Sequence, residues 1–246
     1  MSAGLVVRAI VLVVLLAFLV APEVFEAVFA PLTDRGAPAI YTQSDMLALA
    51  ANHLGLVAAA TTVATLVAVG LAIVVTRPFG AEFLPLSRSI ANIGQTFPPI
   101  AVLALAVPAL GFGAAPTFVA LFLYGLLPIF ENALTGLTGL QPTVRDAARG
   151  MGMTGTQRLV QVELPLALPV ILAGIRLSTV IALATATIGS TVAASTLGEV
   201  IIAGLLTNNV AFILQGGLVV GALAVLIYDA FLWIERALAR RMGRFA

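Results

Sequence analysis

The sequence has no cysteine, no lysine and a single histidine, His53. The absence of cysteine excludes disulfides, thiolate metal ligands and cysteine nucleophiles, and one histidine cannot form a histidine-based metal cluster. Charge is scarce as well, since only 9% of the 246 residues are charged, whereas soluble domains carry about 25%. The net charge of +1 gives no indication of a nucleic-acid partner or an acidic substrate. A soluble domain is therefore excluded, and neither a metal site nor nucleic-acid binding is expected.

Apolar residues dominate the chain instead: 61% of the residues are hydrophobic and the mean hydropathy is +1.13. Several apolar runs exceed the roughly 18 residues that cross the hydrocarbon core of a bilayer. The first run is longer than the apolar part of an ordinary signal peptide, and no small-x-small cleavage site closes it, so we expect it to remain as a helix. The sequence thus predicts an all-α membrane protein with about six transmembrane helices, at residues 5–21, 45–76, 87–110, 116–140, 164–194 and 211–238.

The segments between these runs define the expected organisation. Residues 195–210 are moderately apolar but too short to cross the membrane and return, so a re-entrant or interfacial helix is expected there. Pro98 and Pro99 interrupt the third run. We expect an N-terminal transmembrane helix and external loop at residues 1–45, a helical core at 46–238 that contains the polar segment 141–165, and a tail at 239–246.

The placement of arginine predicts the orientation. With six spans, one side of the membrane receives ten arginines and the other receives only Arg35. The positive-inside rule therefore places both termini, together with residues 141–165, in the cytoplasm. Arg176 falls inside the fifth run, near enough to its cytoplasmic end to extend to the interface. The ten arginines are Arg8, Arg77, Arg88, Arg145, Arg149, Arg158, Arg236, Arg240, Arg241 and Arg244.

The polar segment 141–165 contains two helix-start signals. Thr143 is followed three residues later by Asp146, which is the pattern of a hydroxyl N-cap with a carboxylate that supports it. Thr154 and Gln157 repeat the pattern. The segment is therefore predicted to contain two short helices on the cytoplasmic face.

Two glycines, Gly150 and Gly152, separate these helices, and either can end the first helix in a left-handed turn. An amphipathic loop lying on the bilayer is one interpretation of the segment. Two caps, two turn glycines and a stripe of mostly small residues favour a shaped element that docks into a partner. The stripe, at i, i+3, i+4 and i+7, consists of Val144, Ala147, Ala148 and Met151.

The spacing of this segment resembles the EAA loop of ABC-importer permeases, which reads Glu-Ala-Ala, three residues, Gly, nine residues and Ile-x-Leu-Pro. Here Asp146 replaces the glutamate, Gly152 matches the glycine, and Val162 replaces the isoleucine. The resemblance implies a role in coupling to an ATPase for Asp146, Ala147, Ala148, Arg149, Gly150, Met151, Gly152, Thr154, Leu164 and Pro165.

The resemblance narrows to the permeases for glycine betaine, carnitine and choline, the osmoprotectant importers. It is carried by residues 148–154 and 162–176, by Gln95-Thr96-Phe97-Pro98 and by residues 184–188. One departure is Glu131, which stands where many relatives carry arginine. The resemblance implies a MetI-like permease fold in the cytoplasmic (inner) membrane of a bacterium, as a non-catalytic subunit without a cofactor of its own.

The same resemblance implies partners: an identical or homologous second permease subunit, two copies of an ATPase subunit that binds ATP and Mg²⁺, and an extracytoplasmic substrate-binding protein. No aromatic cage for a quaternary ammonium group is evident in the spans, so high-affinity recognition is expected in the binding protein.

Polar residues in the third, fourth and fifth runs are candidates for a translocation path, although such residues also form hydrogen bonds between helices. Glu131 is costly in a membrane and therefore a functional candidate, or it is an arginine-paired carboxylate near the cytoplasmic end. The candidates are Asn92, Gln95, Thr96, Glu131, Asn132, Thr185, Thr187 and Ser190.

Three alternatives remain open. A permease for amino acids or another small organic cation would share every feature above except the cargo. A secondary transporter or channel would need buried carboxylates, for which Glu131 is the main candidate, and no repeat relates the two halves of the chain. An intramembrane enzyme would have little to work with, since paired buried acids are absent.

Overall fold

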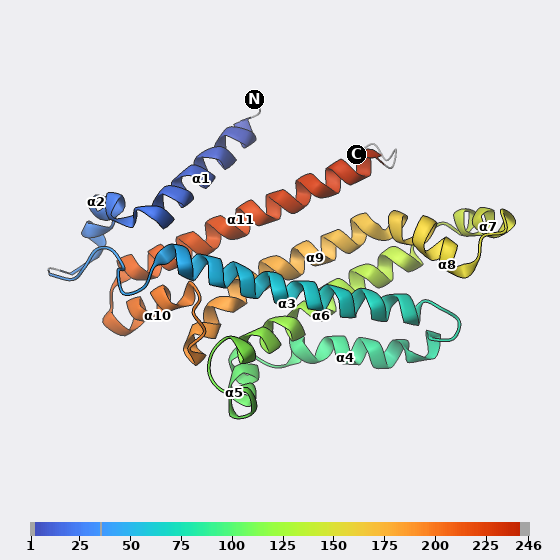
Figure 1. The fold of residues 1–246 in the computed structure, drawn as a ribbon, viewed down its shortest axis with the longest axis horizontal. Helices are drawn as coiled ribbons and strands as arrows, with labels where there is room; N and C mark the ends of the chain where they lie inside the picture. Colours follow the sequence, from blue (N-terminus) through green and yellow to red (C-terminus); the bar gives the residue numbers. More distant parts are fainter. Residues whose placement is uncertain (1–2, 35, 242–246) are drawn as a thin grey trace. The chain divides into compact units, whose positions relative to one another are not determined.

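The computed structural model describes residues 3–34 and 36–241, and the chain forms helices with no strand in these two ranges (Figure 1). Arg35 and Arg244, which entered the orientation argument, lie outside the described residues. The α-helices are α1 (Ala3–Val20), α2 (Glu26–Phe29), α3 (Met46–Val75), α4 (Leu84–Thr96), α5 (Pro99–Leu110), α6 (Ala114–Thr138), α7 (Pro142–Gly150), α8 (Gly155–Arg158), α9 (Leu164–Ala186), α10 (Gly198–Thr207) and α11 (Val210–Arg241). Shorter turns are the 3₁₀ segments η1 (Pro22–Phe25), η2 (Ala30–Leu32), η3 (Ala81–Phe83) and η5 (Thr187–Val192), and the π-helical η4 (Leu159–Glu163).

The chain divides into two compact units, and several long helices contribute one part to each unit. The first unit consists of Met1–Ala59, Pro98–Leu121 and Ala182–Asp229, and the second of Ala60–Phe97, Phe122–Ile181 and Ala230–Ala246.

Four helical stretches are long and apolar enough to cross a membrane, and the number rises to six if each of two broken pairs counts as one span. The expectation of an all-α protein with about six spans is thereby confirmed. α10 has ten residues, about 15 Å of helix, which is too short for a hydrocarbon core of about 30 Å. The four stretches are Met46–Val75, Ala114–Thr138, Gly155–Val192 and Val210–Arg240.

Proline sets the end of α1. Ala21 precedes Pro22 and leaves the helical region, with φ −140° and ψ 66°, as expected from the clash between a proline ring and the preceding residue. The following turns, Pro22–Leu32, bend away by 114°. The first apolar run is therefore a helix to Val20 and a separate folded-back segment beyond it.

Proline also divides the third expected span into α4 and α5. Phe97 has an extended backbone, with φ −100° and ψ 142°, and Pro98 has ψ 142°. Pro99 is the first residue of α5, a position where its missing N–H costs nothing. The interruption predicted from Pro98 and Pro99 is confirmed, and α4 begins at Leu84, earlier than expected.

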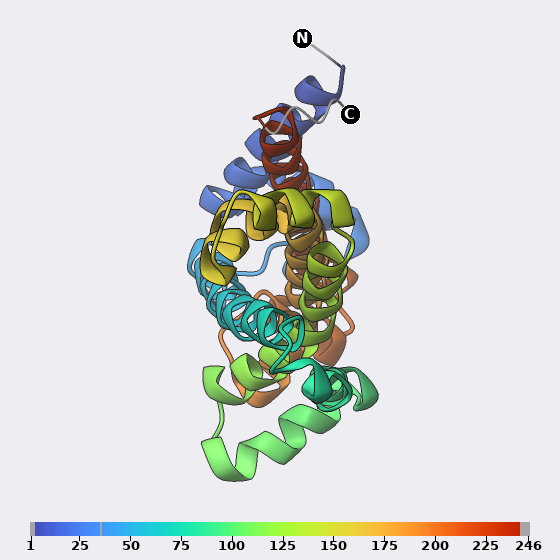
Figure 2. The ribbon, with the colours of Figure 1, turned by 90° about the vertical axis from the view of Figure 1, so that its right-hand side faces the viewer.

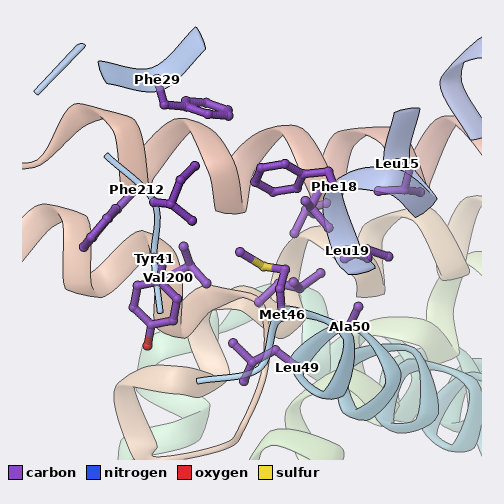
Figure 3. Close-up of a cluster of buried hydrophobic side chains, with 14 of the residues drawn as sticks. Leu15, Phe18, Leu19, Phe29, Tyr41, Met46, Leu49, Ala50, Val200 and Phe212 are labelled. Atoms are coloured by element: carbon purple, nitrogen blue, oxygen red, sulfur yellow. The ribbon is translucent and has the colours of Figure 1, made fainter. Parts of the chain in front are cut away.

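The core of the first unit joins α1, α2, α3, α10 and α11 (Figure 3). Phe18 of α1 contacts Phe29 of α2, with ring centroids 5.7 Å apart. Tyr41 meets Phe212 of α11 edge to face, at 5.3 Å. Met46, at the start of α3, is buried beside them. These contacts fix the loop before α3 against the end of the chain's first helix and the start of its last.

Three polar side-chain contacts tie this loop to α11. Asn209 Nδ2 donates to the carbonyl of Pro38 at 2.8 Å. Gln215 Nε2 donates to the carbonyl of Ala39 at 2.7 Å, and Gln215 Oε1 accepts from the backbone N–H of Tyr41 at 3.1 Å. Gln215 is fully buried. All three bonds end on backbone atoms of the loop, so the two amides hold its path without an adjoining strand.

The loop also contacts α10. The Tyr41 hydroxyl donates to Glu199 Oε1 at 2.8 Å, and Ser44 donates to the same carboxylate. Burial raises the pKa of the Tyr41 hydroxyl, and the Glu199 carboxylate raises it further. The hydroxyl therefore stays protonated and keeps donating over the physiological pH range.

The core of the second unit packs the latter part of α3 against α6 and α9. Ala64, Ala68 and Ala72 recur every four residues on α3 and are fully buried. Small side chains at this spacing let helix backbones approach closely. Ile129 and Phe130 of α6 are fully buried in the same core.

Gly94 of α4 marks a close approach between α4 and α6. A Cβ at this position would lie 2.2 Å from the backbone oxygen of Leu123, so Gly94→Ala must push α4 away from α6. We expect it to destabilise the purified protein by about 1–3 kcal/mol, as overpacked substitutions do, in detergent-based unfolding. Gly70→Ala is the matched control, because nothing lies within 4 Å of its added Cβ. Equal stabilities of the two variants would contradict the expectation.

Candidate functional site

The first helix of the polar segment, α7, starts differently from its prediction. The N-cap is Gln141, no side chain caps the helix, and Pro142 occupies its first turn. The predicted capping box of Thr143 and Asp146 is therefore wrong. Proline already has the φ angle of a helix and lacks the N–H that would otherwise need a partner, so the helix starts at Pro142.

The end of α7 is a glycine turn, as predicted. Gly152 adopts φ +76°, and its N–H donates to the carbonyl of Arg149 at 2.9 Å. The N–H of Met153 donates to the carbonyl of Ala148 at 3.2 Å. This pair of bonds is the Schellman arrangement, which satisfies the last carbonyls of a helix and needs a left-handed residue.

The second predicted capping box is confirmed. Thr154 Oγ1 accepts from the backbone N–H of Gln157 at 3.3 Å, and Gln157 Oε1 accepts from the backbone N–H of Thr154 at 2.8 Å. Four residues of α8 follow, so the chain reverses between two helices whose ends are both hydrogen-bonded. Figures 1 and 2 show α7 and α8 side by side.

The chain then enters α9 without leaving the helical conformation. The N–H of Leu164 donates to the carbonyl of Leu159, a π-type bond that closes η4. Pro165 follows, and it has no N–H for an ordinary helical bond. A π turn is a common local adjustment of a helix. Leu164 and Pro165 are thus the first residues of α9, and no sequence pattern predicted the π turn that precedes them.

The apolar stripe of α7 is divided between two environments. Ala148 is 2% exposed and Val144 is half-buried, so these two face the second unit's own residues. Ala147 is exposed, and Met151 is 73% exposed. The outward surface of α7 therefore combines a small residue, a flexible thioether and the exposed Asp146–Arg149 pair, whose charged atoms lie 3.6 Å apart.

Two arginines anchor this segment to the rest of the second unit. Arg145 of α7 donates to the backbone carbonyl of Leu137 in α6. Arg77, after α3, forms an ion pair with Glu163 of η4 at 2.5 Å, and the Glu163 side chain is 7% exposed. Sequence analysis missed the partners, because 86 residues separate Arg77 from Glu163. The available sequence signal for this pair was an acidic residue, Glu163, directly before the point where the chain was predicted to re-enter the membrane.

Three path candidates lie on α4 and are all exposed in the second unit. Gln95 Nε2 donates to the carbonyl of Tyr124 in α6 at 2.9 Å. Thr96 Oγ1 donates within its own helix, to the carbonyl of Ile93 at 2.7 Å. α4 thus carries a polar exposed face that includes Asn92.

Glu131 of α6 is an arginine-paired carboxylate, one of its two interpretations. Arg88 of α4 donates through Nε to Oε1 at 2.6 Å and through Nη2 to Oε2 at 3.1 Å. Both side chains are exposed, at 52% for Arg88 and 36% for Glu131. Charges are unfavourable against hydrocarbon, so this face is suited to water or protein. The neighbouring Asn132 donates to the carbonyl of Pro128 at 2.8 Å.

The other path candidates lie in the first unit. Thr187 donates to the carbonyl of Ala184 at 2.7 Å. Ser190 Oγ lies 2.8 Å from Thr196 Oγ1, and Thr185 is half-buried on α9. The eight candidates therefore form two groups, one in each unit, and their role as a path stays a prediction.

Two further ion pairs involve arginines of the orientation argument. Arg8 of α1 pairs with Asp229 of α11 at 2.6 Å, so the start of the first helix lies beside a late part of the last helix in the first unit. Arg176 of α9 pairs with Glu235 of α11 at 3.1 Å in the second unit, with both side chains 17% exposed. Arg176 was expected to extend to the interface alone, whereas the fold supplies a carboxylate partner.

No group of three or more His, Asp or Glu side chains is placed to hold a metal ion in the described part of the chain. The single histidine, His53, is fully buried on α3, with Nε2 3.0 Å from the carbonyl oxygen of Leu183.

Residues 66–244 match the family described as "Binding-protein-dependent transport system inner membrane component". The osmoprotectant import permease protein OsmY of Salmonella typhimurium is 40% identical over 197 residues, 80% of this chain and 84% of that protein. The glycine betaine/carnitine/choline transport system permease protein OpuCB of Bacillus subtilis is 38% identical, over 66% of this chain and 78% of that protein. The carnitine transport permease protein OpuCB of Listeria monocytogenes is 38% identical, over 79% of this chain and 88% of that protein.

A chain from an inward-facing structure of the MetNI methionine ABC transporter has the same fold, with a TM-score of 0.70 at 21% sequence identity. The match covers 78% of this chain and 95% of that chain. The MetI-like fold is therefore confirmed.

Proposed function

The chain belongs to the family of binding-protein-dependent transport system inner membrane components, and from this premise we propose that it is the permease subunit of an ATP-driven importer for an osmoprotectant. Glycine betaine, carnitine and choline are the cargoes in the names of its relatives. The observation that carries the proposal is the segment 142–165, a helix, a left-handed turn and a capped helix with the family spacing. Any enzymatic step lies outside this chain, in an ATPase subunit that binds ATP and Mg²⁺.

The outward surface of α7 is the proposed contact with that ATPase. Ala147 and Met151 are exposed on it, so a groove of the partner could receive a small residue and an adaptable thioether. The Schellman turn and the capping box hydrogen-bond both sides of the reversal. A helix fixed in this way transmits a displacement, and the Arg77–Glu163 pair passes it to the end of α3.

The full assembly proposed here contains two ATPase copies, a second permease subunit that is identical or homologous, and an extracytoplasmic substrate-binding protein. The chain is a multi-pass membrane protein. We place both termini in the cytoplasm of a bacterium, on the arginine bias and on the Arg8–Asp229 pair, which joins the first helix near its start to the second half of α11.

A translocation path along the exposed polar face of α4 and the Arg88–Glu131 pair is part of this proposal. These groups require water or protein beside them, and a path between two permease subunits supplies both. The path residues proposed are Asn92, Gln95, Thr96, Glu131, Asn132, Thr185, Thr187 and Ser190.

Reconstitution in liposomes with the ATPase and the binding protein tests the proposal. We expect uptake of radiolabelled glycine betaine, carnitine or choline that requires ATP hydrolysis and the binding protein. If the transporter takes up an amino acid and none of the three osmoprotectants, the proposed cargo is wrong and the permease role stands. Uptake by the chain alone, driven by an ion gradient, would instead establish a secondary transporter.

A further inference from the structure

A cavity of about 490 Å³ lies in the first unit, between α3, the first residue of α6 and residues 193–196. Its wall turns sharply at Ala193, which adopts a left-handed backbone with φ 63°. This conformation is unfavourable for a residue with a Cβ, and it persists only where the surroundings fix it, often beside a binding site. The N–H of Gly113 donates to the carbonyl of Val192 at 2.7 Å, which holds the turn against the start of α6.

Hydrogen bonds fix the remainder of this wall. Thr196 Oγ1 donates to the carbonyl of Ala186 at 3.0 Å, and Ser190 Oγ lies 2.8 Å from the same hydroxyl. Thr196 is buried. The wall is therefore a preformed surface, and its strained residue is held by contacts on both sides.

Two polar side chains of the lining, one from α3 and one from the segment after η5, have no hydrogen-bond partner among the described residues. Asn52 of α3 and Ser195 both line the cavity and are exposed to it. Neither side chain forms a hydrogen bond with any residue in ranges 3–34 and 36–241. Asn52 lies in a helix long and apolar enough to cross a membrane, where an amide is unfavourable unless water, protein or a ligand meets it.

The lining specifies the chemistry of a ligand. Apart from Asn52, Ser195 and Thr196, the lining residues are apolar, and most are alanine or glycine. An amide N–H and a hydroxyl donate well to a carboxylate, whereas a quaternary ammonium has no hydrogen to donate and only needs room. The volume lies within the range of small-molecule sites, roughly 300–1,000 Å³.

We propose that this cavity holds a small zwitterionic cargo during transport, with its carboxylate bound by Asn52 and Ser195 and its alkylated ammonium against the small residues. The inference rests on the proposed function and adds to it a preference: the site distinguishes a carboxylate-bearing cargo such as glycine betaine from choline, which has a hydroxyl in place of the carboxylate.

The test compares uptake of radiolabelled glycine betaine and choline by the complete transporter in liposomes. Asn52→Asp keeps the size of the side chain and places a carboxylate against that of the cargo. Asn52→Leu combined with Ser195→Ala removes both donors. We expect betaine uptake to fall by about tenfold in Asn52→Asp, the change for one lost hydrogen bond to a charged group, and by more in the double variant, which loses two. Choline uptake should stay within about twofold. Thr62→Val, on α3 but outside the cavity lining, is the control and should change neither.

The outcomes separate this inference from the proposed function. If the wild type transports betaine and the variants keep both uptakes or lose both equally, the carboxylate site is overturned and the permease role stands. Wild-type uptake of choline without betaine also overturns the site alone. If the wild type takes up neither compound in the presence of ATP, the proposed function itself is overturned. Size-exclusion profiles and basal ATPase rates of each variant complex identify a misfolded chain. If the double variant misfolds, Asn52→Asp provides the comparison, because it preserves the shape of the side chain.

Discussion

Replacing Glu163 with alanine is expected to destabilise the protein by about 3 kcal/mol, because it leaves the guanidinium of Arg77 with no carboxylate in a largely buried position. The pair is 2.5 Å apart, and the two side chains are 19% and 7% exposed. Loss of one partner of a buried ion pair costs about 3–5 kcal/mol, and the partial exposure of Arg77 favours the lower end. Unfolding of the purified chain in detergent micelles measures the change.

Two variants control this experiment. The exchange Arg77→Glu with Glu163→Arg should recover part of the lost stability, since it restores opposite charges at the same two positions. Asp146→Asn removes a partner of an ion pair that is 3.6 Å long and well exposed, so its stability should change by under about 1 kcal/mol. If Glu163→Ala is no more destabilising than Asp146→Asn, the buried pair does not hold the polar segment in place.

Gly152→Val is expected to leave the chain inserted but to abolish most coupled transport. Gly152 has φ +76°, a left-handed conformation that costs other residues about 1–2 kcal/mol and β-branched residues more. The turn must then open, and the hydrogen bonds from Gly152 and Met153 to the end of α7 are lost. We expect uptake in the reconstituted transporter to fall by about tenfold or more, while cargo no longer stimulates ATP hydrolysis.

Nearby substitutions separate backbone strain from simple crowding. Gly152→Asn should keep most of the uptake, because asparagine tolerates the left-handed region. Gly150→Ala should be neutral, since Gly150 is helical and nothing lies within 4 Å of an added Cβ. Normal cargo-stimulated ATPase activity in Gly152→Val would refute the coupling role of this turn.

Local signals in the sequence predicted the features whose partners are a few residues apart. Thr154 and Gln157 are three residues apart, so nothing distant competes for their bonds, and the box forms. Thr143 carried the same pattern, but Pro142 occupies the first turn of the helix and moves the N-cap to Gln141. The break at Pro98 follows in the same way from the backbone limits that proline imposes.

Features that depend on pairing across the chain could not be derived from local pattern. Glu131 was recognised as a costly carboxylate, yet its partner Arg88 lies 43 residues away. Asn52 is one polar residue in a long apolar run, and only the fold brings Ser195 into the lining of the same cavity. Which acid meets which arginine is set by how the helices pack, and periodicity does not encode that.

Asn209 and Gln215 hold the loop before α3 through its backbone, so substitutions on the two sides of this contact are expected to have different effects. Asn209 binds the carbonyl of Pro38, and Gln215 binds the carbonyl of Ala39 and the N–H of Tyr41. These backbone groups remain when the side chains change, except that proline at position 41 would remove the N–H. These bonds therefore do not depend on the loop's side chains, although Ala39 and Tyr41 are also buried in the core of the first unit. Asn209 and Gln215 act through their side chains, and Gln215 uses its amide as donor and acceptor at once. Homologous chains are accordingly expected to vary more at Pro38 than at Asn209 and Gln215.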